Sequence, residues 1–408
     1  MGVEYNALPS ALADAVVTAT ADWHAKNKVA RLWDRDASLW TGRDENLWLG
    51  WLDVMRQQRA SLVGLRNFAR DVNGDGFTDV VLLGMGGSSL CADVLRTTFG
   101  HLDDAPELHI LDSTDPAQVR RIEESVRLES ALFIVASKSG STLESMLFEQ
   151  YFFERVRRCV GISHVGSRFV AITDPGSALE QLADSKRFRA TFHGLQTIGG
   201  RYSALSHFGM VPAVTMGINV SRLLDRAEAM AAMCGATTAV ANNPAVQLGL
   251  LLGMAGLQGR DKVTVVTSPE ICGLGCWLGQ LLAESTSKNG HGLIPVYGER
   301  LGSPSVYGDD RLFVYLRLDT TLDTKQDAAV KQLWTSGCPV IRLGLRDVYD
   351  VGAEFFRWEM ATAVAGAVLG VNPFDQPDVE ASKAATRNMM TEFENLGQLP
   401  YEEPVARL

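Results

Sequence analysis

Short apolar runs recur along the chain at regular spacing, and a stretch with helical character follows each of them. A buried parallel strand is a short continuous apolar run, and strands that alternate with helices build a parallel sheet. The pattern predicts two series of strands: Asp79–Leu83, Leu108–Leu111, Leu132–Ala136 and Phe169–Ile172, then Val263–Val266, Leu293–Tyr297, Leu312–Leu318 and Val340–Leu343. We therefore predict an α/β chain with two doubly wound parallel sheets in a three-layer α/β/α arrangement.

Two other segments have helical patterns. Ser10–Phe68 is helical and rich in tryptophan, and we expect its helices to pack across the sheets. Ile218–Gly256 is rich in Ala, Met and Leu, with a break at Asn242-Asn243-Pro244, and is typical of linking helices. The predicted organisation of the 408 residues is an N-terminal helical segment (1–70), a first sheet domain (71–225), a second sheet domain (226–385) and a C-terminal tail (386–408).

The composition of the chain limits the kinds of partner that it is expected to bind. The formal net charge of −10 and the lack of a basic stripe argue against nucleic acid and against an anionic membrane. No stretch approaches 18 uninterrupted apolar residues and the N-terminus does not resemble a secretory signal, so we expect a soluble cytoplasmic protein. The six cysteines are scattered and are interpreted as reduced. Cys272 and Cys276 have helical spacing but no nearby histidine, which favours interior packing over a zinc site.

The most informative segment follows the third predicted strand. An apolar run ends in Ser137-Lys138-Ser139-Gly140-Ser141-Thr142, and a predicted helix begins at Leu143. The N-terminus of a helix presents unpaired amides and a positive dipole end, while the hydroxyls, one lysine and one glycine suit an anion. This pattern predicts a phosphate site, although it is not a nucleotide-binding Walker A motif. The alternative is an ordinary serine or threonine helix cap.

A glycine-rich loop follows the first predicted strand. Its sequence, Gly84-Met85-Gly86-Gly87-Ser88-Ser89, lacks the spacing of a dinucleotide fingerprint. Ligands of open α/β sheets lie beyond the carboxyl ends of the strands, where neighbouring loops meet. We therefore predict that Gly86, Gly87 and Ser88 approach the same ligand as the Ser137–Thr142 loop. The alternative is a tight glycine turn without a ligand.

Two segments supply candidate catalytic groups. In Gly199-Gly200-Arg201-Tyr202-Ser203 an arginine follows two glycines, where its guanidinium can meet an oxyanion; the alternative is a solvated turn arginine. Gln280 and Glu284 are four residues apart on one predicted helix face. A carboxylate in apolar surroundings suits a general base, because burial disfavours its charged form. The alternative is an exposed Glu284 paired with Lys288.

The last segment is Val371–Lys383, an irregular loop with two prolines that leads into a helix. Gln376 and Lys383 are seven residues apart, which is two helical turns. Phe374 and the prolines are too apolar for a free linker, so we expect a docked loop that brings Lys383 to a pocket. The alternative for Lys383 is an ordinary solvated surface lysine.

Taken together, the five ordered segments resemble the phosphoglucose isomerase family of the sugar-isomerase (SIS) fold group. The match runs from about Val80 to Lys383, and within the family the chain looks most similar to the isomerase half of bifunctional transaldolase/phosphoglucose isomerase proteins. The resemblance implies two SIS domains, a homodimer, a sugar-phosphate substrate, and isomerisation of glucose 6-phosphate to fructose 6-phosphate without a metal or an organic cofactor.

The resemblance also implies roles. Ser88, Ser137, Lys138, Ser139 and Thr142 would hold the 6-phosphate, and Gly86, Gly87, Ser141 and Gly200 are further expected substrate-binding positions. Glu284 would move a proton between C2 and C1, Arg201 would stabilise the enediolate, Gln280 and Gln376 would position hydroxyls, and Lys383 would assist ring opening. One positioned base and one cation are the minimum that this chemistry needs.

The chain departs from the family at one position. Relatives carry a ring-opening histidine, donated across the dimer interface, where this chain reads Gly308-Asp309-Asp310-Arg311-Leu312-Phe313. Arg311, His207, His291 or Lys383 would have to replace it, or the enzyme would use the open-chain sugar. Two alternatives to glucose-6-phosphate isomerisation follow: a non-catalytic sugar-phosphate-binding regulatory module, and an isomerase for another phosphosugar such as mannose 6-phosphate.

Overall fold

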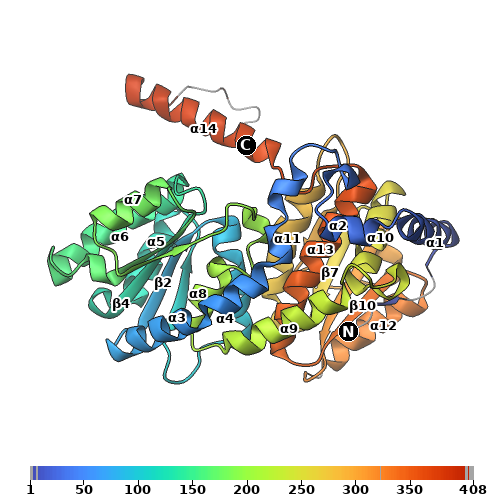
Figure 1. Ribbon diagram of the computed structural model, residues 1–408, viewed down its shortest axis with the longest axis horizontal. Helices are drawn as coiled ribbons and strands as arrows, with labels where there is room; N and C mark the ends of the chain where they lie inside the picture. The colour runs from blue at the N-terminus through green and yellow to red at the C-terminus, as the bar shows by residue number, and fades with distance from the viewer. Residues whose placement is uncertain (1–2, 6–7, 322, 400–402, 404–408) are drawn as a thin grey trace. The chain divides into compact units, whose positions relative to one another are not determined.

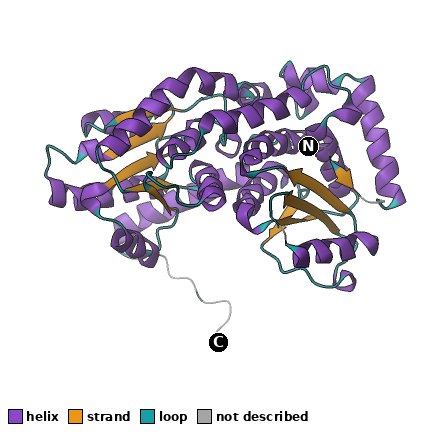
Figure 2. Cartoon of the chain, turned by 90° about the horizontal axis from the view of Figure 1, so that it is seen from below, coloured by secondary structure: helices purple, strands orange, loops and turns teal. Residues whose placement is uncertain are grey.

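The computed structural model describes residues 3–5, 8–321, 323–399 and 403. The chain divides into two compact units, residues 1–373 and 374–408. The first unit contains both sheets, each with helices on its two faces (Figures 1 and 2). Among its described residues the second contains helix α14 (Pro377–Leu396), and the predicted tail 386–408 lies partly outside the described residues. Helices run through the predicted domain boundaries near 70, 225 and 385, which stay predictions.

The first sheet has five parallel strands in the order β3-β2-β4-β5-β6. The strands are β2 (Asp79–Gly84), β3 (Glu107–Leu111), β4 (Ala131–Ala136), β5 (Phe169–Thr173) and β6 (Ala190–His193). The accompanying helices are α4 (Leu90–Phe99), α5 (Pro116–Ser125), α6 (Leu143–Val160), α7 (Ala178–Ser185) and α8 (His207–Thr215). The order is that of a doubly wound sheet, as predicted. β6 was not predicted, because its half-exposed residues do not form an apolar run.

The core of this sheet is aromatic. Every residue of β4 is buried, and the ring of Phe133 stacks on Phe152 of α6 and on Phe169 of β5, with centroids 5.1 and 5.0 Å apart. Each fully buried phenylalanine stabilises the fold by about 1.5–3 kcal/mol. This packing holds the start of α6 against the end of β4, which is where the predicted phosphate loop lies.

The second sheet has the order β1-β10-β9-β7-β8. Its strands are β1 (Glu4–Tyr5), β7 (Lys262–Thr267), β8 (Ile294–Tyr297), β9 (Arg311–Leu318) and β10 (Val340–Leu345), and its helices are α10 (Pro244–Leu257), α11 (Gly273–Thr286), α12 (Thr324–Thr335) and α13 (Val351–Leu369). Four of its strands are parallel, as predicted, and a short strand that the sequence did not indicate joins them at the edge. The two-residue β1 pairs antiparallel with β10 and is too short to leave an apolar signature.

Four helices cover or link the sheets: α1 (Ser10–Ala25), α2 (Lys28–Trp33), α3 (Val54–Gly74) and α9 (Val220–Met233). α1 packs on α10, and α3 packs on α8 and α9. The N-terminal segment is thus helical as predicted, except that residues 34–53 form only short 3₁₀ turns. Asn243 caps α10 at the predicted break. Among the helices in the described part of the chain, none combines the length and apolarity that crossing a bilayer requires.

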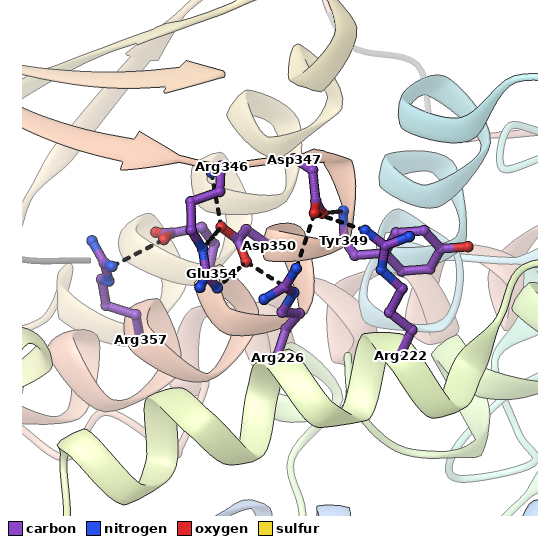
Figure 3. Close-up of polar contacts among 8 residues, drawn as sticks. All are labelled: Arg222, Arg226, Arg346, Asp347, Tyr349, Asp350, Glu354 and Arg357. Carbon is purple, nitrogen blue, oxygen red and sulfur yellow. Dashed lines mark hydrogen bonds and ion pairs between the residues drawn. The ribbon is translucent and has the colours of Figure 1, made fainter. Parts of the chain in front are cut away.

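A network of charges joins α9 to the start of α13 (Figure 3). Arg226 of α9 donates to Asp347 at 2.9 Å and pairs with the buried Asp350 at 3.3 Å, and Arg222 donates to Asp347 at 2.7 Å. Farther along α13, the buried Glu354 pairs with Arg357 at 3.3 Å. Buried charges need such partners, because an isolated charge in the interior is costly.

The cysteine prediction was wrong in one respect. Cys272 is exposed and Cys276 half-buried, so the pair does not pack in the interior. The reason is that Cys272 is the N-cap of α11 rather than part of its buried face. All six cysteines are free thiols, as interpreted from the sequence.

Candidate functional site

Two loops meet at the carboxyl edge of the first sheet. β2 and β4 are neighbours with Gly84 opposite Ala136, so the loops that follow them start side by side. A Cβ on Gly84 would lie 3.1 Å from the carbonyl of Ser88 and 3.3 Å from that of Ala136. The prediction that the glycine loop (Gly84–Ser89) and the serine loop (Ser137–Thr142) share one edge of the sheet is confirmed.

The serine loop is held open by its own contacts. The buried Ser137 donates from Oγ to Oγ1 of Thr142 at 2.9 Å. Gly140 has φ of +67°, and a Cβ there would lie 2.6 Å from Cβ of Ser177, so the turn requires glycine. Thr142 precedes α6 but makes no side-chain cap hydrogen bond, which argues against the ordinary-cap alternative. The start of an 18-residue helix faces this loop, an arrangement that favours an anion.

Lys138 has partners that the sequence analysis did not find. Its ammonium forms a short ion pair with Asp174, which directly follows β5 at the same sheet edge, and it lies 6.0 Å from the ring centre of Trp48. The Lys138 side chain is 21% exposed. The sequence could have indicated Asp174 as a site residue, because it directly follows a buried strand. It gave no such indication for Trp48, which lies 90 residues before Lys138 in a segment without regular periodicity.

The glycine loop packs against the segments that carry Gly200 and Gln280. A Cβ on Gly87 would lie 2.2 Å from the carbonyl oxygen of Gly200, and one on Gly86, whose φ is +53°, would lie 2.6 Å from Nε2 of Gln280. The loop therefore connects the serine loop to the segments that carry Arg201 and Gln280. These contacts explain why both positions require glycine, and the binding of a ligand at this loop stays a prediction.

Replacing Gly87 by alanine is expected to destabilise the fold, because the new methyl group would collide with backbone rather than with a movable side chain. Overpacking of this kind costs about 1–3 kcal/mol. Thermal unfolding measures the effect, with Gly64→Ala as the control: Gly64 is an exposed residue of α3 with open space at its Cβ, and alanine there should be neutral or stabilising. Equal melting temperatures for Gly87→Ala and the unmodified protein would contradict this steric account.

Arg201 and Glu284 form an ion pair at the centre of the site. Nη1 of Arg201 donates to Oε2 of Glu284 at 2.9 Å, and the arginine is only 6% exposed. Its Nε donates to Oγ of Ser285 at 3.0 Å and its Nη2 to the carbonyl of Pro373 at 3.1 Å. The alternative of a solvated turn arginine is wrong, because acceptors from two segments distant in sequence hold the buried guanidinium.

The Glu284 carboxylate is held from a second side. Nε2 of Gln280 donates to its Oε1 at 3.0 Å, one helical turn earlier on α11, so the predicted shared face is confirmed. The side chain of Glu284 is 30% exposed and therefore open to a ligand, while Arg201 beneath it is buried. Nζ of Lys288 donates to the carbonyls of Ser285 and Asn372. Ser285, which the sequence analysis missed, follows the base candidate directly.

The remaining candidates have other partners or belong to the second compact unit. His207 is bonded through Nδ1 to the carbonyl of His193 at 2.8 Å, and burial lowers its pKa; His291 is an exposed residue of a tight turn. Arg311 begins β9 and donates to Thr264 and Glu299. Gln376 and Lys383 belong to the second compact unit, where Gln376 precedes α14 and Lys383 is an exposed partner of Glu380 at 2.9 Å.

The sequence of this chain is similar to those of known proteins. A family model described as phosphoglucose isomerase matches residues 52–289. A glucose-6-phosphate isomerase of Rubrobacter xylanophilus is 33% identical, over 78% of this chain and 84% of that protein. A probable glucose-6-phosphate isomerase of Methanococcus maripaludis is 25% identical, over 84% of both.

Solved structures agree on the fold. A hypothetical protein from Thermus thermophilus superposes with a TM-score of 0.81 at 22% identity, over 95% of this chain and 99% of that one. A glucose-6-phosphate isomerase from Chlamydia trachomatis gives 0.71 at 21% identity, over 90% and 78%. A tagatose-6-phosphate ketose/aldose isomerase from Escherichia coli gives 0.55 at 18% identity, over 83% and 95%.

Proposed function

The chain belongs to the phosphoglucose isomerase family, and on this premise we propose that it is an aldose–ketose isomerase that interconverts glucose 6-phosphate and fructose 6-phosphate. The observation that carries the proposal is the Arg201–Glu284 pair, in which a buried cation lies 2.9 Å from a partly exposed carboxylate. Two relatives over most of the chain bear the name of this activity.

The proposed chemistry starts with a proton on the carbon next to a carbonyl. Glu284 takes the proton from C2 of open-chain glucose 6-phosphate, and the electron pair forms the C1=C2 double bond while O1 becomes the enediolate oxygen. A proton then passes from the hydroxyl group on C2 to O1, and Glu284 returns its proton to C1, which leaves a carbonyl group at C2. Arg201, fixed by Ser285 and the Pro373 carbonyl, faces the negative oxygen that develops in this step. A preorganised charge of this kind contributes several kcal/mol to catalysis, since it needs no rearrangement during the reaction.

The 6-phosphate binds at the serine loop in this proposal. Ser137, Ser139, Ser141 and Thr142 offer hydroxyl groups, α6 offers its N-terminal amides, and Lys138 offers a charge. Gly86, Gly87, Ser88 and Gly200 bring backbone close to the ligand between the two ends of the site. Gln280 positions a sugar hydroxyl while it holds Glu284.

The roles of Gln376 in hydroxyl binding and of Lys383 in ring opening rest on the family resemblance, as do a homodimer, a cytoplasmic location and the relationship to transaldolase fusions. Six free cysteines suit a reducing compartment. Light scattering of the purified protein tests the dimer: a monomeric mass at assay concentration would contradict it.

The activity is tested by supplying fructose 6-phosphate and coupling glucose 6-phosphate formation to a dehydrogenase. Saturable turnover supports the proposal. Stabilisation by the sugar phosphate without turnover would favour the regulatory-module alternative, and turnover with mannose 6-phosphate alone would favour the other isomerase.

Replacing Lys138 by methionine is expected to raise KM for fructose 6-phosphate about 10- to 100-fold with a smaller change in kcat, because hydrogen bonds to charged groups contribute roughly 1.5–3 kcal/mol. Part of the increase comes from Asp174, which loses its partner beside the anion. The double variant Lys138→Met/Asp174→Asn should therefore recover some affinity. Steady-state kinetics of both variants decide this, and an unchanged KM in the single variant would exclude Lys138 from phosphate binding.

A further inference from the structure

One buried acid has no place in the chemistry described so far. Glu359 lies in the middle of α13 with none of its surface exposed, and neither of its carboxyl oxygens has a hydrogen-bond partner of normal geometry among the described residues. The backbone amide of Ala204 faces its carboxyl group. Ala204 is three residues beyond Arg201, so Glu359 lies behind the segment that carries the proposed oxyanion partner.

Burial raises the pKa of the Glu359 carboxyl well above its usual range, since the charged form loses hydration. Burial therefore favours the neutral carboxylic acid, which has one hydroxyl donor and one carbonyl acceptor. Buried polar groups normally have hydrogen-bond partners, and an unused acid in a core is costly.

The helix face that carries Glu359 contacts residues that pack on or bind the Arg201 segment. Phe356, Glu359, Ala363 and Gly366 lie three or four residues apart and share one face of α13. The ring of Phe356 lies 5.9 Å from that of Trp51, which in turn lies 5.6 Å from the ring of Tyr202, next to Arg201.

The other end of this face supports the second anchor of the guanidinium. A Cβ on Gly366 would lie 2.9 Å from Cβ of Pro373, whose carbonyl accepts from Nη2 of Arg201. Between these contacts, the carbonyl of Ala363 accepts from Nε1 of Trp40 at 2.7 Å. One helix thus contacts Trp51, which packs on Tyr202 beside Arg201, and also Pro373, which anchors the guanidinium, and Glu359 lies between these two contacts on the same helix face.

We propose that Glu359 is a positioning residue: its buried carboxyl group lies against the backbone of the Arg201–Ala204 segment, keeps that segment in place, and so sets the Arg201 guanidinium opposite Glu284. Glu359 does not touch the sugar. The proposal rests on the proposed role of Arg201, because the alignment matters for turnover only if the guanidinium stabilises the enediolate.

The test compares Glu359→Gln, Glu359→Asp and Glu359→Met. Glutamine keeps one donor and one acceptor at the same distance and should keep kcat within about threefold. Methionine fills the space without either and should lower kcat about tenfold with KM within about twofold, because the loss falls on a group that acts in the transition state. Aspartate retains the acid on a side chain that is one methylene shorter, and its kcat should lie between those of the glutamine and methionine variants. It also provides a second test if the methionine variant fails to fold.

Glu354→Met is the matched control. Glu354 is equally buried on the same helix, but it points to Arg357 in the network of Figure 3. Its loss should lower the melting temperature and leave kcat of the folded enzyme unchanged. The proposal is overturned if Glu359→Met lowers only the melting temperature, if Glu359→Gln loses as much kcat as methionine, or if the Glu354 control loses kcat equally.

Crystal structures separate this inference from the proposed activity. In Glu359→Met the distance from Nη1 of Arg201 to Oε2 of Glu284, 2.9 Å in the unmodified protein, should lengthen, while in Glu359→Gln it should not. An unmodified protein without turnover would refute the activity and leave this readout intact. An unchanged distance in the methionine variant would refute the positioning role whatever the activity.

Discussion

Replacing Glu284 by glutamine is expected to lower kcat by about two to four orders of magnitude, roughly the range of general acid–base contributions. Glutamine preserves the shape of the side chain and keeps an oxygen that can accept from Arg201, but it cannot take a proton from C1 of fructose 6-phosphate or from C2 of glucose 6-phosphate at neutral pH. KM for fructose 6-phosphate should change little, because the phosphate binds at the separate serine loop. Steady-state kinetics and solvent-deuterium exchange at C2 measure the two parts of the prediction.

Two variants control for the loss of charge. Glu284→Asp keeps the carboxylate but withdraws it by one methylene, and its kcat should fall between those of the unmodified protein and Glu284→Gln. Glu154→Gln removes another acid bonded to two arginines, Arg157 and Arg158, on an exposed helix face, and should leave kinetics unchanged. Near-full activity of Glu284→Gln would eliminate Glu284 as the base and redirect the search to other groups at this edge.

Replacing Arg201 by methionine is expected to lower kcat by about two to three orders of magnitude, the typical cost of losing one oxyanion partner. The change should also lower the melting temperature, since Ser285 and the Pro373 carbonyl lose their donor and Glu284 loses its ion-pair partner. Because Glu284 is 30% exposed, the loss of stability should be below the roughly 3–5 kcal/mol seen when fully buried pairs are broken.

Two further variants separate the contributions of charge, hydrogen-bond geometry and overall stability to the effect of losing Arg201. They are Arg201→Lys and Arg226→Met. Lysine keeps the charge but has no planar fork that reaches three acceptors at once, so it should recover stability better than kcat. Arg226→Met breaks the ion pairs of α9 with Asp347 and Asp350, and should lower the melting temperature without changing kcat. An Arg201→Met enzyme whose kcat is unchanged would show that no cation is needed at this position.

Most of the fold was predictable because its signals are local. A parallel strand buried on both faces, such as β4, must be apolar along its whole length, and such runs marked the strands of both series. The strands that were missed, β1 and β6, are short and border the sheets, where one face or edge meets solvent and the apolar run is lost. The exposure of Cys272 was also missed, because this residue lies at the start of a helix and not on its buried face.

The site was predictable where function depends on a local pattern. The serine loop combines a strand end, a positive-φ glycine and a helix start within a short stretch of chain, and Gln280 and Glu284 meet because one helical turn separates them. The five segments also carry the family resemblance by their motifs and their order, and four of them lie within residues 52–289, which the phosphoglucose isomerase model matches.

The sequence by itself determined the two doubly wound sheets, the loops at one sheet edge and the candidate base, because backbone periodicity and loop chemistry act over a few residues. Only the tertiary structure decided which charges pair. Arg201 meets Glu284 across 83 residues, Lys138 meets Asp174 across 36, and Glu359 comes to lie behind Ala204 through the packing of α13. Such partners are selected by how whole helices and sheets pack, and that packing sums many weak contacts with no local signature.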